Sequence, residues 1–268
     1  MNSIINTKNL WFAYENRNWI LRGINIDIYP SEIVSLIGPN GCGKTTLVKH
    51  FNGLLKPVKG KVFVKDIDTS RASPAELSRI VGYVFQNPNY QIFSATVFEE
   101  TIFGPKNFGV ENPEQTAFSS IKDVGLEDKM KISPFSLSLG EKERLAIASV
   151  LAITPQVFIF DEPTTGQDRS TTKKIIKIVN RMRKSNKTVI IITHDMELAS
   201  ECSDRVFVMN RGIIEKVGDP HEIFSDERLL RKIQLSPPTI VTIGKSLAMN
   251  SVPLTVEEFV KRLKNEID

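Results

Sequence analysis

The chain has 268 residues, which is enough for one large α/β domain or for one domain with an appendage. Its hydrophobic share of 41% and charged share of 25% are typical of globular proteins, and its net charge of +4 points to neither nucleic acid nor an anionic membrane as a partner. The two cysteines argue against a disulfide framework, and no apolar run approaches the ~18 residues of a membrane-spanning helix. Residues 1–8 are polar and mixed, so we expect no signal peptide and a cytoplasmic or peripheral protein.

Residues 4–37 are predicted to be rich in β-strands. Within them, 24–28 alternates apolar and polar side chains with a period of two, as in a half-buried strand. Tyr14 lies in an aromatic segment, 11–14, ahead of that strand. An aromatic ring at this place could stack on an adenine base or could pack in an ordinary β-core, and the segment is compatible with both.

A phosphate-binding pattern, G-x-x-x-x-G-K-T, lies between an apolar strand at 33–37 and a helix predicted at 47–51. Its glycines let successive backbone N–H groups turn toward phosphate oxygens, and the helix adds the positive end of its dipole. Lys44 is expected to neutralise the β- and γ-phosphates and Thr45 to ligate Mg²⁺, so the sequence predicts binding of a nucleoside triphosphate. The residues of this loop are Gly38, Pro39, Asn40, Gly41, Cys42, Gly43, Lys44, Thr45 and Thr46.

A strand predicted at 81–85 ends at Gln86. Before it, Ser73 and Glu76 form the pattern of a helix-capping box. At the carboxyl end of a strand beside a phosphate site, Gln86 could ligate Mg²⁺ or hold the attacking water, and it could equally be an ordinary loop residue.

From 87 to about 151 the pattern becomes helical, and we expect a helical subdomain inserted into the sheet domain. Thr96 and Asn112 are candidate caps for two of its helices. The segment 137–141 is expected to open a longer helix from Lys142 to Ile153, whose apolar side chains fall on one face.

Two acidic residues follow the apolar strand predicted at 157–160. An all-apolar run is typical of a central parallel strand, which would place Asp161 and Glu162 at the sheet edge where ligands bind. There Asp161 can hold Mg²⁺ through water, and Glu162 can polarise the attacking water. A second strand of this kind, 188–193, ends at His194, which can reach a γ-phosphate or can be a residue of a helix cap.

The remaining chain divides into a hairpin at 206–215 and a short appendage. We predict an ATPase domain at 1–235 and an appendage at 236–268, which carries one helix at 256–264.

In this order, the motifs resemble the ATPase subunits of ABC transporters over residues 3–225. The matching segments are Tyr14, the phosphate loop 38–46, Gln86, the signature 137–141, the strand 157–162, the turn 164–168 and His194. The resemblance implies an α/β P-loop fold with a mostly parallel sheet, an N-terminal antiparallel β subdomain and an inserted helical subdomain. It also implies ATP and Mg²⁺ as cofactors and a head-to-tail dimer, in which ATP lies between one subunit's phosphate loop and the other's signature helix.

The resemblance assigns a role to each site residue. Tyr14 would stack on adenine, Thr45 and Gln86 would hold Mg²⁺, and Glu162 would act as the base for water. His194 would contact the γ-phosphate, and Ser138 and Gly140 would contact the ATP bound mainly by the partner subunit.

The segment 84–105 and the tail, 235–238 and 254–259, are similar to the energy-coupling factor importers, including the cobalt type. This resemblance implies a peripheral subunit on the cytoplasmic face of the cell membrane, beneath a transmembrane scaffold protein and a substrate-binding membrane protein. The substrates implied are vitamins or transition-metal ions, with no nucleic-acid partner.

The competing classes are a soluble ABC-type ATPase that acts on a macromolecular complex and a non-catalytic regulatory module. A single ATPase domain without a sustained heptad run favours the transporter over the former. The catalytic-type residues Lys44, Asp161, Glu162 and His194 argue against the latter.

Three positions depart from the family pattern. Leu139 and Glu141 stand where glycine and glutamine are usual, and Gln167 stands where leucine is usual. The first two predict a weaker signature, so a heterodimer with a second ABC ATPase subunit is slightly favoured over a homodimer.

Overall fold

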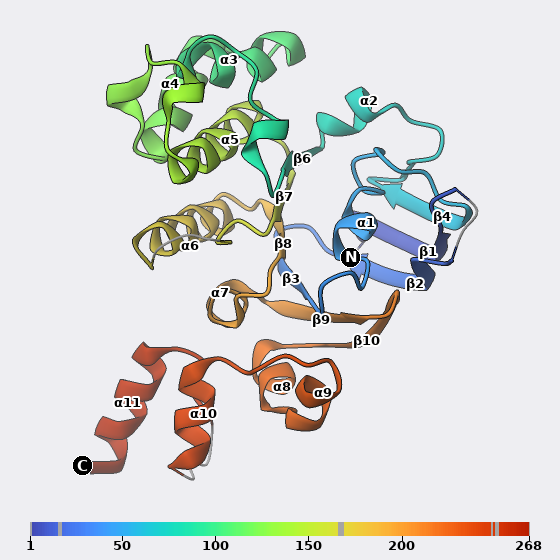
Figure 1. Cartoon of the computed structure of the whole chain (residues 1–268), viewed down its shortest axis with the longest axis vertical. Coiled ribbons are helices and arrows are strands. Elements are labelled where there is room, and N and C mark those ends of the chain that lie inside the picture. The colour runs from blue at the N-terminus through green and yellow to red at the C-terminus, as the bar shows by residue number, and fades with distance from the viewer. Residues whose placement is uncertain (1, 16–17, 166–168, 248, 250–251, 268) are drawn as a thin grey trace.

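A six-stranded sheet forms the centre of the molecule, with the strand order β10-β9-β3-β8-β7-β6 (Figure 1). The computed structural model describes residues 2–15, 18–165, 169–247, 249 and 252–267. All neighbouring strands of this sheet are parallel except β9 and β10, which form the predicted hairpin. The strands are β3 (Ile33–Ile37), β6 (Val81–Val84), β7 (Val157–Asp161), β8 (Thr188–Ile192), β9 (Arg205–Asn210) and β10 (Ile213–Gly218). Every residue of β3, β7 and β8 is buried, as their apolar runs predict for central parallel strands.

A second, antiparallel sheet has the order β2-β1-β4-β5. Its strands are β1 (Ile5–Phe12), β2 (Leu21–Ile28), β4 (Lys59–Val64) and β5 (Ile67–Asp68). In β2 the buried side chains of Ile24, Ile26 and Ile28 alternate with exposed ones, so the period-two pattern is confirmed. Helix α1 (Lys44–Val48) lies between the two sheets, and one apolar cluster joins both sheets to it.

Helices α3 (Val97–Phe108), α4 (Pro113–Asp123) and α5 (Leu139–Ile153) form the upper part of Figure 1. Short 3₁₀ turns, η1 (Pro88–Tyr90), η2 (Glu127–Lys129) and η3 (Pro134–Ser136), connect them to the sheet and to one another. Capping boxes begin both α3 and α5. The predicted start of the last helix at Lys142 is wrong by three residues, because Ser138 already caps the backbone N–H of Glu141.

Three further helices accompany the strands of the central sheet. Helix α2 (Pro74–Ser78) precedes β6 and has the predicted capping box, in which the Ser73 side chain accepts from the Glu76 backbone N–H. Helix α6 (Arg169–Lys184) precedes β8, and α7 (Met196–Cys202) follows it.

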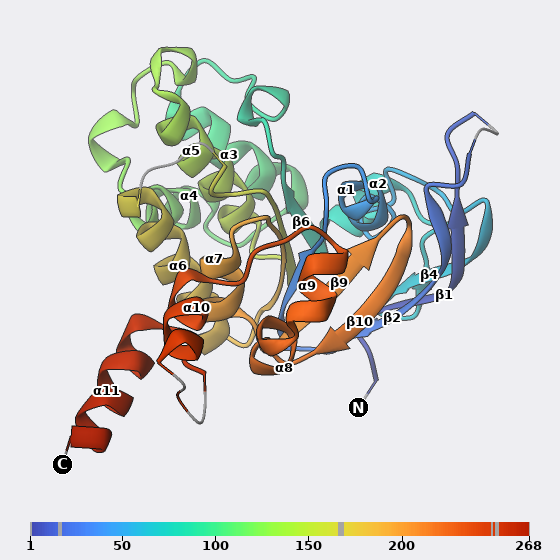
Figure 2. The ribbon, with the colours of Figure 1, turned by 60° about the horizontal axis from the view of Figure 1, so that its bottom comes forward.

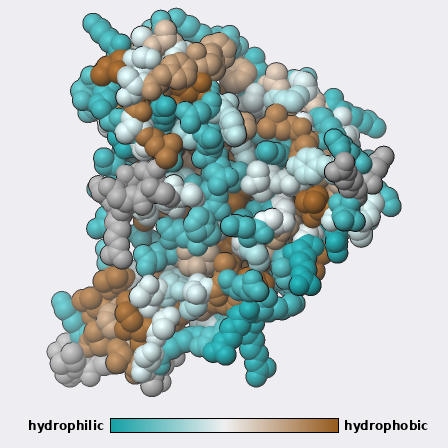
Figure 3. All heavy atoms as spheres, in the orientation of Figure 1, coloured by the Kyte–Doolittle hydropathy of each residue, from teal (hydrophilic) through white to brown (hydrophobic). Residues whose placement is uncertain are grey.

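After β10, the described residues form the helices α8 (Pro220–Ser225), α9 (Glu227–Lys232), α10 (Thr239–Ser246) and α11 (Val256–Ile267). The prediction of one helix in the appendage is therefore wrong, because α10 precedes α11. Helix α10 is short and rich in threonine and glycine, which weakens its helical pattern, and its Val241 packs in a cluster with Phe224 and Leu254. Figure 2 shows α11 at the outer end of the molecule, and Figure 3 shows apolar surface around it. Within the described residues, no helix is long and apolar enough to span a membrane.

Candidate functional site

The phosphate loop leaves β3 and turns directly into α1. Gly38 has φ +154° and Gly43 has φ +107°, conformations that favour glycine. A Cβ at Gly38 would lie 2.1 Å from the Met209 carbonyl oxygen, so no other residue fits there without moving the backbone of β9. A turn bond of 3.3 Å from Cys42 N–H to Pro39 O closes the loop, and Asn40 and Gly41 are exposed at its tip. Helix α1 begins at Lys44 rather than at the predicted position 47, so it starts inside the loop pattern itself.

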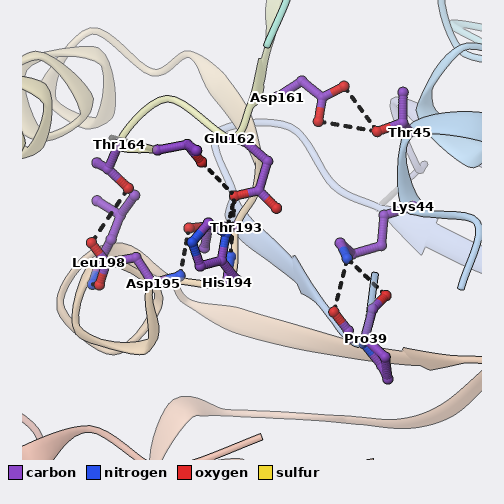
Figure 4. A network of polar contacts seen from close by, with 12 residues as sticks. Pro39, Lys44, Thr45, Asp161, Glu162, Thr164, Thr193, His194, Asp195 and Leu198 are labelled. Carbon is purple, nitrogen blue, oxygen red and sulfur yellow. Dashed lines mark hydrogen bonds and ion pairs between the residues drawn. The ribbon is translucent and has the colours of Figure 1, made fainter. Parts of the chain in front are cut away.

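Lys44 is a buried cation held within this loop. Its side chain is 7% exposed, and its Nζ donates to the backbone oxygens of Gly38, at 2.8 Å, and of Pro39, at 3.1 Å (Figure 4). Because both acceptors are carbonyls, no carboxylate neutralises Lys44 through these bonds. Its positive charge therefore remains available to an anion in the loop.

Asp161 at the end of β7 faces Thr45. The Thr45 hydroxyl donates to both Asp161 carboxylate oxygens, at 3.2 Å and 3.0 Å. Sequence reasoning missed a third member, Tyr83, whose hydroxyl donates to Asp161 Oδ2 at 2.6 Å. Burial, together with the negative charge of Asp161, raises the pKa of Tyr83 above its usual value, so the phenol stays protonated as a donor. The sequence does not mark this contact, because it depends on the parallel pairing of β6 with β7, in which Tyr83 lies opposite Ile159.

The next residue, Glu162, points toward His194 instead. Its Oε2 lies 2.6 Å from His194 Nδ1 and also accepts from the His194 backbone N–H at 3.3 Å and the Thr165 hydroxyl at 3.2 Å. Glu162 has φ +53°, which is uncommon for a residue with a side chain, and it is 8% exposed. Asp195, beside His194, accepts from the Thr164 hydroxyl and caps α7. The rest of the predicted turn, including Gln167, lies outside the described residues.

The other predicted residues lie in two places. Tyr14 follows β1 and is 46% exposed, with its hydroxyl 3.3 Å from Thr46 Oγ1, so the structure brings it to the phosphate loop. Gln86 is exposed two residues beyond β6, and in the described part of the chain no hydrogen bond joins it to Thr45 or Asp161.

Ser138 and Gly140 lie at the start of α5, and this helix is apart from α1 in both ribbon views (Figures 1 and 2). The Ser138 hydroxyl donates to Glu141 Oε2 at 3.0 Å and accepts from the Glu141 backbone N–H at 3.4 Å. The contact with Lys129 and the Ser138 backbone N–H lower the pKa of Glu141 to about 2, so this carboxylate is ionised and already paired. Leu139 beside it is 53% exposed.

A phosphate loop that follows a parallel strand, with carboxylates at the end of β7, two strands away in the same sheet, defines a P-loop nucleoside triphosphatase. The sequence pattern of the ABC transporter family matches residues 21–165. The chain belongs to the ABC transporter family, and it is an ATP-binding and ATP-hydrolysing subunit of the ABC type.

Two relatives show how far the similarity extends. An energy-coupling factor transporter ATP-binding protein, EcfA, of Methanocaldococcus jannaschii is 44% identical over 88% of this chain and 86% of its own length. A putative ABC transporter ATP-binding protein of Caldanaerobacter subterraneus is 42% identical over 97% of this chain. The chain spans 46% of the length of that second relative.

Solved structures agree with the sequence similarity. The structure of cbiO1 from Clostridium perfringens, described as part of the ABC transporter complex cbiONQ, matches with a TM-score of 0.77 and 34% identity, covering 93% of this chain and 100% of cbiO1. A dimeric ATP-binding cassette in a post-hydrolysis state with ADP and Pi matches with a TM-score of 0.73 and 28% identity, covering 81% of this chain and 98% of that cassette. The resemblances to ABC ATPases and to the energy-coupling factor type are therefore confirmed, and so is the α/β P-loop fold.

Proposed function

We propose that ATP hydrolysis takes place where the phosphate loop meets the ends of β7 and β8. Lys44 neutralises the β- and γ-phosphates, Glu162 is the general base for water, and His194 contacts the γ-phosphate. The observation that carries this proposal is that Asp161 contacts Thr45 while the adjacent Glu162 contacts His194. Two neighbouring carboxylates thus face different partners, as separate roles in metal binding and water activation require.

Thr45 and Asp161 fit a Mg²⁺ ion, and Gln86 is proposed as a further ligand. A hydroxyl and a carboxylate within 3.0 Å of each other are oxygen donors of the kind that Mg²⁺ takes. The buried phenol of Tyr83 holds the Asp161 carboxylate in place for this role. When bound, Mg²⁺ neutralises charge on the β- and γ-phosphates.

The functional unit of the proposal is a head-to-tail dimer with a second ABC ATPase subunit. Ser138 and Gly140 of this chain approach the ATP held mainly by the partner. The signature departs from the family at Leu139, whose exposed side chain stands where a close approach favours glycine, so a heterodimer is slightly favoured.

The dimer is proposed to power an importer of the energy-coupling factor type, for a vitamin or a transition-metal ion, from the cytoplasmic face of the membrane. Its partners are a transmembrane scaffold protein and a substrate-binding membrane protein. The names of EcfA and cbiO1 support this class. An exposed aromatic surface after Gln86 supports a protein partner nearby: Tyr90 is 80% exposed, and Phe93 packs edge-to-face on Phe103 at 4.8 Å. The alternative is a soluble ABC-type ATPase that acts on a macromolecular complex.

Co-purification of a tagged chain from detergent-extracted membranes tests the proposal that the chain belongs to an importer. The full chain should sediment with membranes and co-purify with a multi-spanning protein when the membrane proteins of its own source are co-produced, and it should stay in the supernatant without them. The double change Tyr90→Ser with Phe93→Ser should reduce this co-purification. Phe118 is an exposed aromatic residue on α4, and Phe118→Ser serves as the control, which should leave the co-purification unchanged. Recovery with ribosomes, and with no membrane protein, would support the alternative.

A further inference from the structure

His50 lies behind the phosphate loop, just after the end of α1, and is fully buried. Its backbone N–H bonds to Leu47 O at 3.1 Å rather than to Thr46 O. The Thr46 carbonyl oxygen forms a hydrogen bond with the His50 ring instead, whose Nδ1 lies 2.8 Å away. Because a carbonyl oxygen can only accept, Nδ1 carries the hydrogen, and the ring fixes the position of Thr46.

The other ring nitrogen, Nε2, is buried and has no hydrogen-bond partner in the described part of the chain. A buried polar atom without a partner costs free energy, and an apolar side chain of similar size would avoid that cost. The stability of the core therefore does not account for a histidine at this position.

The His50 ring also contacts the residue that orients Tyr14. It packs edge-to-face on Phe12, with the ring centroids 4.8 Å apart, and Phe12 packs edge-to-face on Tyr14 at the same distance. Tyr14 is otherwise held by its hydroxyl, 3.3 Å from Thr46 Oγ1. Both supports of the Tyr14 ring, Phe12 and Thr46, are thus in direct contact with His50.

We infer that His50 is a positioning residue for recognition of the nucleotide base. It holds Phe12 through its ring edge and Thr46 through its Nδ1–H, and these two residues hold Tyr14 in the orientation that stacks on adenine. The inference rests on the stacking of Tyr14 on adenine, which the family resemblance implies and which we propose as part of the function of this chain. It separates two parts of nucleotide binding: His50 acts on the base, whereas Lys44 and the loop N–H groups act on the phosphates.

The test compares ATP with inorganic tripolyphosphate, which lacks the adenosine and therefore the base, both with Mg²⁺, on the full chain. His50→Leu removes the N–H donor and the aromatic edge. It should weaken ATP binding about tenfold, which is the scale of one aromatic pair and one hydrogen bond, and should change tripolyphosphate binding less than about twofold. His50→Phe keeps an aromatic ring against Phe12 and removes both ring nitrogens, the unpartnered Nε2 and the donor to Thr46, so it should fold and show a smaller loss that is again confined to ATP.

Two further variants distinguish an effect of His50 that acts through Tyr14 from a general effect of a change in the core. Val64 is buried on β4, opposite Ile5, and Ile5 lies at the other end of β1 from Phe12. Val64→Ala should therefore leave the ratio of the affinities for ATP and tripolyphosphate unchanged. Tyr14→Ala should reproduce the loss specific to ATP, and adding His50→Leu to it should cause no further loss.

The outcomes separate the two proposals. Equal weakening of both ligands by the folded His50 variants, or no weakening of either, would overturn the role of His50. A Tyr14→Ala protein with unchanged preference for ATP would overturn the stacking of Tyr14 itself.

Discussion

At the scale of single residues, Glu162 combines a left-handed backbone with a buried carboxylate that has three donors on one oxygen. Glu162→Gln keeps an oxygen that can accept from His194 and leaves Lys44, Thr45 and Asp161 intact. The variant should therefore bind ATP and Mg²⁺ normally and lose activation of the water. We expect turnover to fall ~10²–10⁴-fold, the usual contribution of a general base.

Phosphate release and ATP binding, measured on the same preparation, check this prediction. Lys44→Ala is the contrasting control, because it should weaken ATP binding itself. If Glu162→Gln retains turnover near that of the unmodified chain, another group activates the water.

His50 also makes the stability of the fold depend on pH. Burial is the main cause that lowers its pKa from 6.5 to about 4, and the backbone groups of Thr46, Leu47 and Lys56 only partly offset it. Between these values the unfolded chain binds a proton that the folded chain does not, so stability falls as the pH falls through this window. The loss between pH 7 and pH 5 should be on the order of 2 kcal/mol.

Urea unfolding of the full chain at the two pH values measures this dependence. His50→Phe cannot titrate and should flatten the difference, whereas the Val64→Ala protein should keep it. An equal pH dependence in His50→Phe would assign the effect to other titrating groups.

The residues that carry chemistry were predictable where a motif fixes their spacing and less so where the fold alone brings them together. Lys44, Thr45, Asp161 and Glu162 follow from the phosphate loop and from an apolar strand that ends in two acids. Tyr83 lies 78 residues from Asp161, and only the parallel pairing of β6 with β7 makes them neighbours. His50 was missed because it lies in an ordinary apolar stretch after the loop, and its contacts with Phe12 come from the packing of β1 on α1.

At the scale of elements, the start of α5 depends on a capping box. The Glu141 side chain accepts from the Ser138 backbone N–H at 2.9 Å and also contacts Lys129. Glu141→Ala removes both interactions and should lower the free energy of unfolding by about 1 kcal/mol. Glu141→Gln keeps the acceptor oxygen for the cap and should retain most of that stability.

Thermal unfolding of the two variants beside the unmodified chain measures the difference. Similar losses in both would mean that the charge pair with Lys129, rather than the cap, stabilises this end of the helix.

Where the sequence predicted an element, its type and order agree with the structure, and its first residue agrees less well; helices α6, α8 and α9 were not predicted. Both helices that begin at site motifs, α1 and α5, start three residues before their predicted positions. In both, the glycine or serine that the motif supplies is itself the cap, so the helix starts inside the motif. Helix α10 escaped prediction because tertiary packing around Val241 and Gly244, where a Cβ would lie 2.4 Å from Pro253, outweighs a weak local pattern.

At the scale of the whole molecule, the proposed dimer brings the start of α5 against the partner's ATP. Of the two departures in the signature, Glu141 should repel that ATP only weakly, because its charge is paired with Lys129. Leu139 is different, since its side chain is 53% exposed at the first position of the helix. The side chain of Leu139 should therefore weaken the contact with the partner's ATP more than the charge of Glu141 does.

The difference between Leu139 and Glu141 predicts how each substitution changes the protein concentration at which the chain dimerises with ATP. In a Glu162→Gln background, where ATP is not consumed, Leu139→Gly should allow closer approach of the helix backbone and give dimers at clearly lower protein concentration. Glu141→Gln should add little in the same background. Sedimentation velocity with and without ATP measures the dimer fraction, and Phe118→Ala, at an exposed apolar position on α4 outside the segment 137–141, serves as the control. A larger gain from Glu141→Gln than from Leu139→Gly would show that charge limits the contact, and no gain from either would show that the signature is neutral in this subunit.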